Sequence, residues 1–460
     1  MQRRVSPRAL PSLLAGIILL PGLLVPLQDT LAALPAGEPL PLTPAALLTA
    51  AIPDATPDAA VLRRGQYLVA AGDCMSCHLR QGGAPLAGGL RLDTPFGVIY
   101  TPNITSDPKT GIGSWTAEQF YRAMHDGIDN EGENLYPAFP YPWFRNVSRA
   151  DDDAMLAYLK TTPAIVYTPP DNELKFPMNR RFVVKFCNML FLDSKEWRDD
   201  PGHPPDWNRG AYLVQGLGHC AECHTPKNWL GGDKSSEELH GARFGDWVAP
   251  DLTGNTRTGL GSWTGDDIAE YLANGRNPHA GAGGPMGEVV TYSTALLSDA
   301  DRKAVAVYLM SQAASPGQTS GAPDSGTLKR GAAIYEDVCS ACHLADGVGQ
   351  PRLFPPLGLN ASVQQADATG VLHVILAGSR LGTSPRRRSP LTMPGFAWKL
   401  TDQQVADVAT YLRNSWGNHA AAIPAGNVSR LRGELGLRTI RYTSNSGDRE
   451  PGEADVTGAR

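Results

Sequence analysis

The sequence predicts a mainly α-helical chain of three tandem domains with loop-rich middles, joined by long proline-rich linkers. At 460 residues, the chain is too long for one compact core. A five-residue cysteine and histidine motif occurs three times with similar surroundings, and such self-similarity indicates a repeat architecture. The 49 glycines and 38 prolines favour loop-rich domains over long regular helices or a wide sheet.

Each repeat begins with a short helical pattern that opens on an arginine and a glycine. These pairs are Arg64-Gly65, Arg209-Gly210 and Arg330-Gly331. A glycine inside a helix costs about 1 kcal/mol relative to alanine, and it is expected where another helix must cross at close range. We therefore predict a helix before each motif, crossed at its glycine by a second helix.

The second helix ends each repeat, and its cap and aromatic register recur. The N-cap residues and their partners three positions on follow the capping-box pattern in Ser148 and Asp151, Ser298 and Asp301, and Thr401 and Gln404. Ten residues after each cap, the sequence reads Tyr158-Leu159, Tyr308-Leu309 and Tyr411-Leu412. The two helices of each repeat are expected to cross with the glycine against this tyrosine.

Composition shifts place the boundaries of the predicted domains. The domains span 61–165, 207–312 and 327–417, and the first two share a block that reads Thr110–Thr116 and Thr258–Thr264. The third domain lacks this block and is the divergent one. The remaining segments are a linker at 37–60, a proline-rich connector at 166–206, a linker at 313–326 and a polar tail at 418–460.

The N-terminus is predicted to be a secretory signal peptide, residues 1–36, which implies a periplasmic protein. Three arginines among the first eight residues supply the positive region, Leu13–Leu27 supplies an apolar core, and Ala32–Ala36 offers small residues near a cleavage point. A permanent membrane anchor is the alternative, but the apolar run is short and contains two prolines. No later stretch reaches the roughly 18 apolar residues of a spanning helix.

Six of the seven cysteines lie in the three Cys-x-x-Cys-His pentads. Their reactive residues are Cys74, Cys77 and His78; Cys220, Cys223 and His224; and Cys339, Cys342 and His343. Two thiols at this spacing reach the two vinyl groups on one edge of a porphyrin and form thioethers, and the adjacent histidine becomes the proximal iron ligand. Zinc sites, dithiol redox sites and disulfides also use cysteine pairs, but the immediate histidine, three times in an exported chain, argues against them. We predict three covalently bound haem c groups, and hence three tandem class I cytochrome c domains.

A methionine shortly before the second helix of a repeat would complete His/Met coordination of the iron. In the second domain the predicted ligand is Met286, within Gly284–Gly287. In the third domain it is Met393, within Thr392–Phe396. Each would be paired with the histidine of its own pentad.

The first domain departs from this pattern. The position nearest to that of Met286 is Phe139, and phenylalanine cannot bind iron. Met124 lies nine residues after Trp115, where the second domain has Leu272 nine residues after Trp263. Met124 is therefore the predicted sixth ligand, with His125 or an open iron as the alternatives.

Proline-bearing loops are predicted to support the proximal histidines. The segment Thr101–Thr105 of the first domain parallels Ala249–Thr253 of the second, and Pro355–Leu357 stands in their place in the third. A backbone carbonyl in such a loop can accept a hydrogen bond from the free N–H of the proximal histidine and fix the orientation of its ring. An ordinary turn is the alternative.

Other features narrow the function. A net charge of −5 argues against a nucleic-acid partner, and the absence of dinucleotide, P-loop and nucleophile-elbow motifs predicts no substrate-oxidising site. Cys187, in an apolar segment, is predicted to be a buried structural thiol, with a bridge to a partner subunit as the alternative. Arg386–Arg388 fit a solvated loop, or docking to an acidic partner or to haem propionates.

From about residue 60 to 417, the chain resembles the tri-haem cytochrome c subunits of bacterial membrane-bound dehydrogenases. These are the partners of quinoprotein alcohol dehydrogenase and of the flavin-dependent gluconate, sorbitol and related sugar dehydrogenases. Besides the pentads, the resemblance rests on Thr101–Thr105, Gly111–Thr116, Leu135–Tyr141, Gly259–Thr264, Gly284–Gly287 and Met393–Leu400.

The resemblance implies an electron-transfer subunit at the outer face of the inner membrane. It would take electrons from a catalytic flavoprotein, quinoprotein or molybdenum-containing subunit and pass them to ubiquinone in the membrane. By the family pattern, a methionine at the position of Phe139 would bind the first iron, and the tail at 418–460 does not look like the family's membrane-contacting end. A free-standing periplasmic carrier and a multihaem enzyme that uses the first haem are the competing hypotheses.

Overall fold

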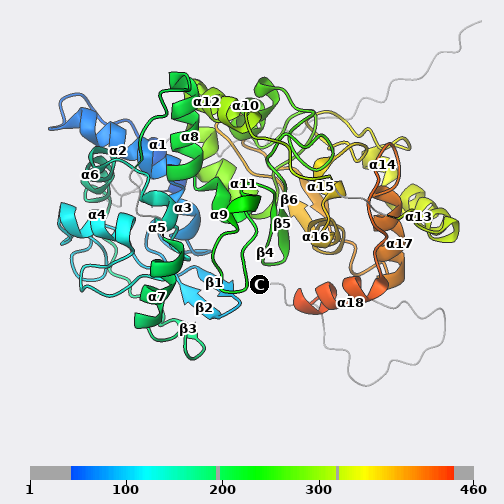
Figure 1. Cartoon of the computed structure of the whole chain (residues 1–460), viewed down its shortest axis with the longest axis horizontal. Coiled ribbons are helices and arrows are strands. Elements are labelled where there is room, and N and C mark those ends of the chain that lie inside the picture. Colours follow the sequence, from blue (N-terminus) through cyan, green and yellow to red (C-terminus); the bar gives the residue numbers. More distant parts are fainter. Residues whose placement is uncertain (1–42, 193–196, 318–320, 440–460) are drawn as a thin grey trace, which may run out of the picture. The chain divides into compact units, whose positions relative to one another are not determined.

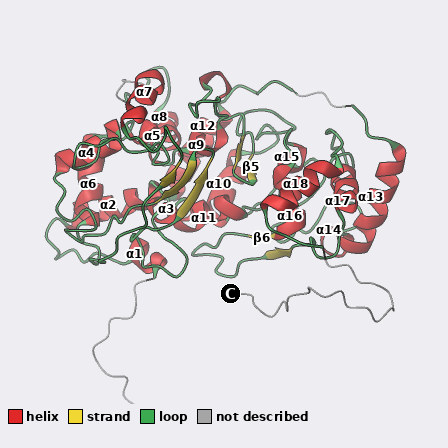
Figure 2. Cartoon of the chain, turned by 90° about the horizontal axis from the view of Figure 1, so that it is seen from below, coloured by secondary structure: helices red, strands yellow, loops and turns green. Residues whose placement is uncertain are grey.

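The computed structural model describes residues 43–192, 197–317 and 321–439, so the predicted signal peptide lies outside the described residues. Helices and loops dominate, and the strands form small antiparallel sheets (Figures 1 and 2). The prediction of a mainly α-helical chain with loop-rich domains is confirmed. Among the described helices, none combines the length and the apolar character that crossing a bilayer requires.

The same helix pair recurs three times. Helix α2 (Ala59–Ala71) packs on α6 (Arg149–Leu159), α8 (Pro205–Tyr212) on α12 (Asp299–Met310), and α13 (Ser325–Val338) on α17 (Asp402–Leu412). A Cβ atom added to Gly65 would lie 2.0 Å from the carbonyl oxygen of Ala154 and 2.8 Å from the Cβ of Tyr158. A Cβ atom added to Gly210 would lie similarly close to Tyr308, and one added to Gly331 would lie similarly close to Tyr411. The predicted crossing of glycine against tyrosine is therefore confirmed in all three repeats.

The helix caps agree with the sequence only in part. Thr401 and Gln404 form a complete capping box at α17. Ser148 and Ser298 cap α6 and α12 through their hydroxyls, which accept backbone N–H groups of Asp151 and Asp301. The aspartate side chains do not return to the cap, because arginine and tyrosine side chains engage them instead.

Short elements fill the space between the paired helices. The first domain adds α1 (Pro44–Thr49), α3 (Cys74–Cys77), α4 (Ala117–Asp126) and α5 (Tyr141–Phe144), and the second adds η1 (Leu213–Leu217), α9 (Cys220–His224), η2 (Ser235–Glu237), α10 (Gly265–Asn274), α11 (Gly284–Tyr292) and η3 (Thr294–Leu296). The third adds α14 (Ser340–His343), α15 (Ala361–Gln364) and α16 (Thr369–Ala377). Helices α4 and α10 both start with a capping box directly after the shared tryptophan block, which explains why that block recurs.

Three small sheets complete the fold of the described residues. They pair β1 (Arg91–Thr94), β2 (Gly97–Tyr100) and β3 (Glu173–Leu174); β4 (Ala242–Phe244) and β5 (Trp247–Ala249); and β6 (Gly378–Arg380) and β7 (Thr392–Pro394). The connector predicted at 166–206 contains β3 and a helix, α7 (Phe182–Phe191).

The polar tail contains a helix that the sequence did not predict. Helix α18 (Ala425–Glu434) packs on α17 and α16. Val428 and Leu431, three residues apart, are both buried. The core of the third domain therefore continues beyond residue 417, because two apolar side chains on one helical face suffice to anchor a short helix.

The hydrophobic core is divided unequally among the repeats. One cluster of buried side chains runs from the first domain into the second and includes residues such as Leu68, Leu217 and Leu309. A separate cluster, which includes Tyr335, Val405 and Leu431, belongs to the third domain. The first two domains are thus joined by a shared core, and the third has its own.

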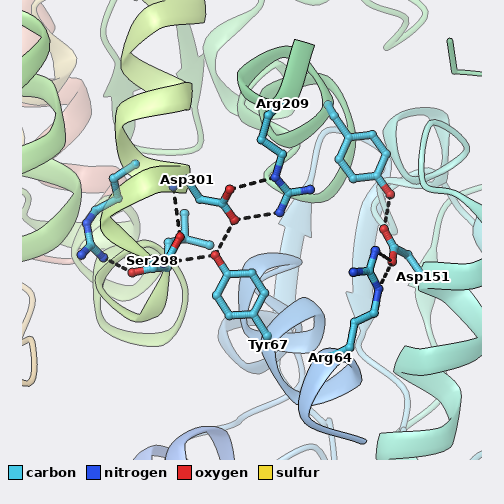
Figure 3. A network of polar contacts seen from close by, with 9 residues as sticks. Arg64, Tyr67, Asp151, Arg209, Ser298 and Asp301 are labelled. Atoms are coloured by element: carbon cyan, nitrogen blue, oxygen red, sulfur yellow. Dashed lines mark hydrogen bonds and ion pairs between the residues drawn. The ribbon is translucent and has the colours of Figure 1, made fainter. Parts of the chain in front are cut away.

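A tyrosine from each of the first two domains reaches into the other (Figure 3). The hydroxyl of Tyr67, on α2, donates to Asp301 of α12 at 2.5 Å and accepts the N–H of Ser298 at 3.1 Å. Arg209, on α8, pairs with the same carboxylate at 2.8 and 2.7 Å. Asp301 therefore holds an arginine of its own domain and a tyrosine of the first.

The reciprocal arrangement surrounds the first domain's aspartate. Tyr212, on α8, donates to Asp151 at 2.7 Å and accepts the N–H of Ser148 at 3.0 Å, while Arg64 donates to Asp151 at 2.6 Å. In the third repeat the tyrosine position is Ala333, and Arg330 pairs with Asp407 of its own domain. The exchange of tyrosines is reciprocal between the first two domains and does not extend to the third.

Candidate haem-binding sites

Each pentad lies directly after the first helix of its repeat, at the start of a short helix. The paired cysteines are three positions apart, so the two thiols of each pair lie on one side of that short helix. All seven cysteines are free, and those of the pentads are partly buried, except Cys342, which is exposed. Burial raises the pKa of Cys74 and Cys77 to about 12, so these thiols are neutral.

Each histidine predicted to be a proximal ligand is held by a proline carbonyl. Nδ1 lies 2.7 Å from the carbonyl oxygen of Pro102 in His78, 2.6 Å from that of Pro250 in His224 and 3.1 Å from that of Pro355 in His343. A carbonyl can only accept, so Nδ1 carries the proton and Nε2 keeps the lone pair that an iron needs. Burial lowers the pKa of His78 to about 4 and also lowers that of the other two. The predicted proline support is confirmed at all three sites.

The methionines of the second and third domains lie on adjoining segments. Met286 lies in the first turn of α11 and is half-buried. Met393 lies in β7, paired with Ser379 of β6. Gly283, three residues before Met286, forms a β-bridge with Leu381, just after β6. The segments that carry the two predicted ligands therefore touch.

The structure aligns Phe139 with Met286. Leu135 donates its backbone N–H to Gly127 at 2.7 Å, and Ala282 donates to Gly275 at 2.7 Å. These glycines end the equivalent helices α4 and α10. Four residues further on from each donor stand Phe139 and Met286, so phenylalanine occupies the position of a ligand in the first domain.

Met124 and His125 are both buried near the end of α4. His125 donates from Nε2 to Asp152 at 2.8 Å, and its ring stacks on Tyr121 with the ring centres 3.9 Å apart. Met124 packs in the shared core, as does its counterpart Leu272. Asp152 engages Nε2 of His125, so only Nδ1 of that ring could bind an iron, and Met124 stays the predicted sixth ligand.

The family assignment follows from comparison with known proteins. The cytochrome c family model matches residues 62–163, 208–313 and 328–416. The gluconate 2-dehydrogenase cytochrome c subunit of Pantoea cypripedii is 38% identical over 405 residues, which cover 83% of this chain and 92% of the relative. The chain belongs to the family of dehydrogenase cytochrome c subunits.

Two further relatives support this family. The cytochrome c subunit of the quinone-dependent alcohol dehydrogenase of Gluconobacter oxydans is 38% identical over 399 residues, which cover 82% of this cytochrome and 83% of the relative. A nicotinate dehydrogenase subunit from Pseudomonas putida is 42% identical over 366 residues. Those residues cover 77% of this cytochrome, which spans only 30% of the length of that relative.

The residues of this cytochrome fit covalent haem c, the cofactor of its family. Each pentad offers two neighbouring thiols to the vinyl groups and a neutral histidine whose Nε2 is free for iron. Haem c, once bound, supplies a one-electron Fe(III)/Fe(II) couple. The protein's part is to orient the proximal histidine and to set the charge and burial around the iron, which tune its reduction potential.

A carboxylate that the sequence did not single out links the second pentad to the first domain. Glu222, inside the second pentad, accepts a hydrogen bond at 3.2 Å from the indole N–H of Trp143, which belongs to α5 of the first domain. Lys227 pairs with it at 3.1 Å. Desolvation raises the pKa of Glu222, although Lys227 opposes this, and the charge of Glu222 in turn contributes to the raised pKa of Cys77. The first two pentads are therefore neighbours in space.

Two other predicted features lie away from the pentads. Cys187, on α7, is half-buried rather than fully buried. Arg386 is exposed and lies 3.9 Å from Asp299 of the second domain, which suits the interpretation of Arg386–Arg388 as a solvated loop.

Proposed function

We propose that this cytochrome carries three haem c groups and passes electrons from a catalytic dehydrogenase subunit to ubiquinone, after export to the periplasm. The observation that carries the proposal is the threefold recurrence of a cysteine pair and a histidine whose Nδ1 is held by a proline carbonyl. The catalytic subunit would be a dehydrogenase, because the relatives are named as subunits of gluconate, quinone-dependent alcohol and nicotinate dehydrogenases. By the family resemblance it would be a flavoprotein, a quinoprotein or a molybdenum-containing protein. This chain would contribute electron transfer and no substrate oxidation of its own.

The arrangement of the sites supports transfer along the chain. The first and second pentads adjoin through Trp143 and Glu222, and the segments that hold Met286 and Met393 adjoin through the bridge between Gly283 and Leu381. Each neighbouring pair of sites thus shares a contact. We propose the iron ligand pairs His78 and Met124, His224 and Met286, and His343 and Met393.

The haem count provides the first test. The purified mature protein should show three haem additions by mass, and the pyridine haemochrome assay should give three haems per chain. Replacing both cysteines of one pentad with alanine should remove one haem and leave the others. Fewer than three additions in the unsubstituted protein would contradict the proposal.

The partner provides the second test. When the protein is purified under mild conditions from its native membranes, a dehydrogenase subunit should co-purify and reduce the haems on addition of its substrate. Reduced haems should then be reoxidised by a soluble ubiquinone analogue. Isolation of a lone carrier, with no co-purifying subunit, would favour a free-standing periplasmic shuttle instead.

Phe139 supports a second candidate function, a redox enzyme that uses the first haem. If the first iron lacks a protein ligand, carbon monoxide or peroxide will bind it and perturb its spectrum. Three low-spin irons without such reactivity exclude this candidate.

A further inference from the structure

Helix α7 is apolar on both of its faces, yet only one face is covered. Val184 is 1% exposed, and Asn188, on the same face, accepts a hydrogen bond from Tyr141 at 2.6 Å. The opposite stripe, at positions i, i+4, i+7 and i+8, consists of Phe182, Phe186, Met189 and Leu190, which are 64, 59, 74 and 70% exposed. Four large apolar side chains exposed side by side on one helix form a surface that a partner is expected to cover.

The exposed stripe is part of a wider surface, here called the α7 patch: Phe176, Phe182, Phe186, Met189, Leu190 and Trp229. Phe176 and Trp229 are 79 and 87% exposed. The loop that carries Trp229 touches the end of α7, because a Cβ atom on Gly232 would lie 2.6 Å from the ring of Phe191. Figures 1 and 2 both place α7 at the edge of the described chain. Contiguous apolar surface of this kind marks an interaction site.

The segment that carries α7 is basic, although Asp129 lies 3.8 Å from Arg181 and Asp233 follows the loop of Trp229. Between residues 174 and 192 there are four basic residues, Lys175, Arg180, Arg181 and Lys185, and no aspartate or glutamate, in a chain whose net charge is −5. Arg181 is anchored by its hydrogen bond to the carbonyl of Asn134 at 2.8 Å. The other three are exposed, beside the phenylalanines.

We propose that the α7 patch docks on an anionic phospholipid bilayer, with its phenylalanines, Leu190 and Trp229 at the boundary between headgroups and acyl chains. Exposed aromatic and aliphatic side chains with interleaved lysine and arginine are the composition of interfacial helices, which lie in the membrane surface without crossing it. The apolar side chains supply burial, and the basic side chains attract the lipid phosphates. The inference rests on the proposed transfer to a membrane quinone and names the surface that brings the cytochrome to it.

Vesicle binding by the full-length mature holoprotein tests the proposal. It should co-sediment with vesicles of mixed phosphatidylglycerol and phosphatidylcholine, and more weakly with phosphatidylcholine alone. Phe186→Glu combined with Leu190→Glu should weaken binding about tenfold or more, because two membrane-buried apolar side chains are lost and two negative charges are added. Arg180→Gln combined with Lys185→Gln should weaken binding only to the anionic vesicles.

The matched control replaces equally exposed apolar residues elsewhere, as Val166→Glu combined with Met310→Glu, and should bind vesicles like the unsubstituted protein. Haem content and reduction by dithionite should be unchanged in all variants, so that a failure of membrane docking is distinguished from a failure of haem binding. Vesicle binding that is absent, or that survives the α7 substitutions, would overturn the proposal. So would loss of a complex with the catalytic subunit or of self-association in the α7 variants while vesicle binding persists.

Discussion

At the scale of single residues, position 139 distinguishes the first site from the other two. Phe139 stands where the second domain has Met286, as the equivalent backbone hydrogen bonds show. Met124 is buried near the end of helix α4, which precedes Phe139 in the chain. Nε2 of the neighbouring His125 is hydrogen-bonded to Asp152. The proposed coordination of the first iron therefore depends on Met124, whose counterpart Leu272 packs in the core of the second domain.

Replacing Met124 with leucine should open the first iron. The fold should tolerate the change, because leucine already fills the equivalent position in the second domain. We expect one of the three haems to become high-spin and to bind carbon monoxide, as measured by optical and electron paramagnetic resonance spectra. Met155→Leu, in the same core, is the control and should leave all three irons unchanged. A fully low-spin Met124→Leu variant would rule out this ligand.

Glu222→Gln should raise the reduction potential of the second haem and, to a smaller extent, that of the first. A nearby carboxylate stabilises the more positive ferric state, and its removal favours the ferrous state. Potentiometric titration of the haem absorbance would measure both shifts. The control is Glu237→Gln, a more exposed carboxylate of the same domain. Unchanged potentials in Glu222→Gln would mean that Lys227 fully neutralises this charge.

At the scale of elements, the four helices α2, α6, α8 and α12 form one unit. Arg64 and Arg209 each bind the aspartate of their own domain. Tyr67 and Tyr212 each bind the aspartate of the other domain. The two networks are equivalent, so the interface is self-complementary, as in a twofold dimer. The two domains are held together by duplicated polar contacts above a shared apolar core.

Tyr67→Phe and Tyr212→Phe should each destabilise the joined first two domains by about 1–3 kcal/mol, because each removes one donor from a partly buried carboxylate and leaves the backbone N–H of Ser298 or Ser148 without its acceptor. Thermal unfolding followed by calorimetry would measure the loss. Tyr335→Phe is the matched control, since that hydroxyl donates to Leu344 within the third domain and should affect only that domain. Equal effects of all three substitutions on one transition would contradict the assignment.

At the scale of the whole molecule, the contacts between the predicted haem sites do not follow the division of the hydrophobic core. The core divides the chain after the second domain, whereas the predicted ligand segments of the second and third domains touch across that division. Electron transfer needs only proximity, so a chain of sites can cross a boundary between separately stabilised bodies. The polar contacts there include the pair of Arg352 with Glu270.

Two unfolding transitions are expected from this division. Val405→Ala should lower only the transition of the third domain, and Leu68→Ala only that of the first two, the latter by about 2–5 kcal/mol. Differential scanning calorimetry, with haem absorbance assigning each transition, would test this. A single transition shifted by both substitutions would show that the boundary between the cores does not divide the cooperative unit.

The sequence alone determined those features that depend on neighbours along the chain. Three features recur in the sequence with similar surroundings: the pentads, the glycine–tyrosine crossings and the proline loops. Because the residues of each feature lie close together or at matching positions in the repeats, their structural roles could be predicted without the fold. The position of Phe139 was readable for the same reason, because two repeats could be aligned from their tryptophans.

Tertiary structure decided what depends on residues far apart in sequence. Asp301 appeared to belong to a capping box, but Tyr67, 234 residues away, takes its carboxylate, and no local pattern encodes that choice. The shared core, the approach of Glu222 to the first pentad and the uncovered stripe of α7 are likewise outcomes of packing. Periodicity specifies that a face is apolar, whereas only the assembled chain specifies whether protein covers it.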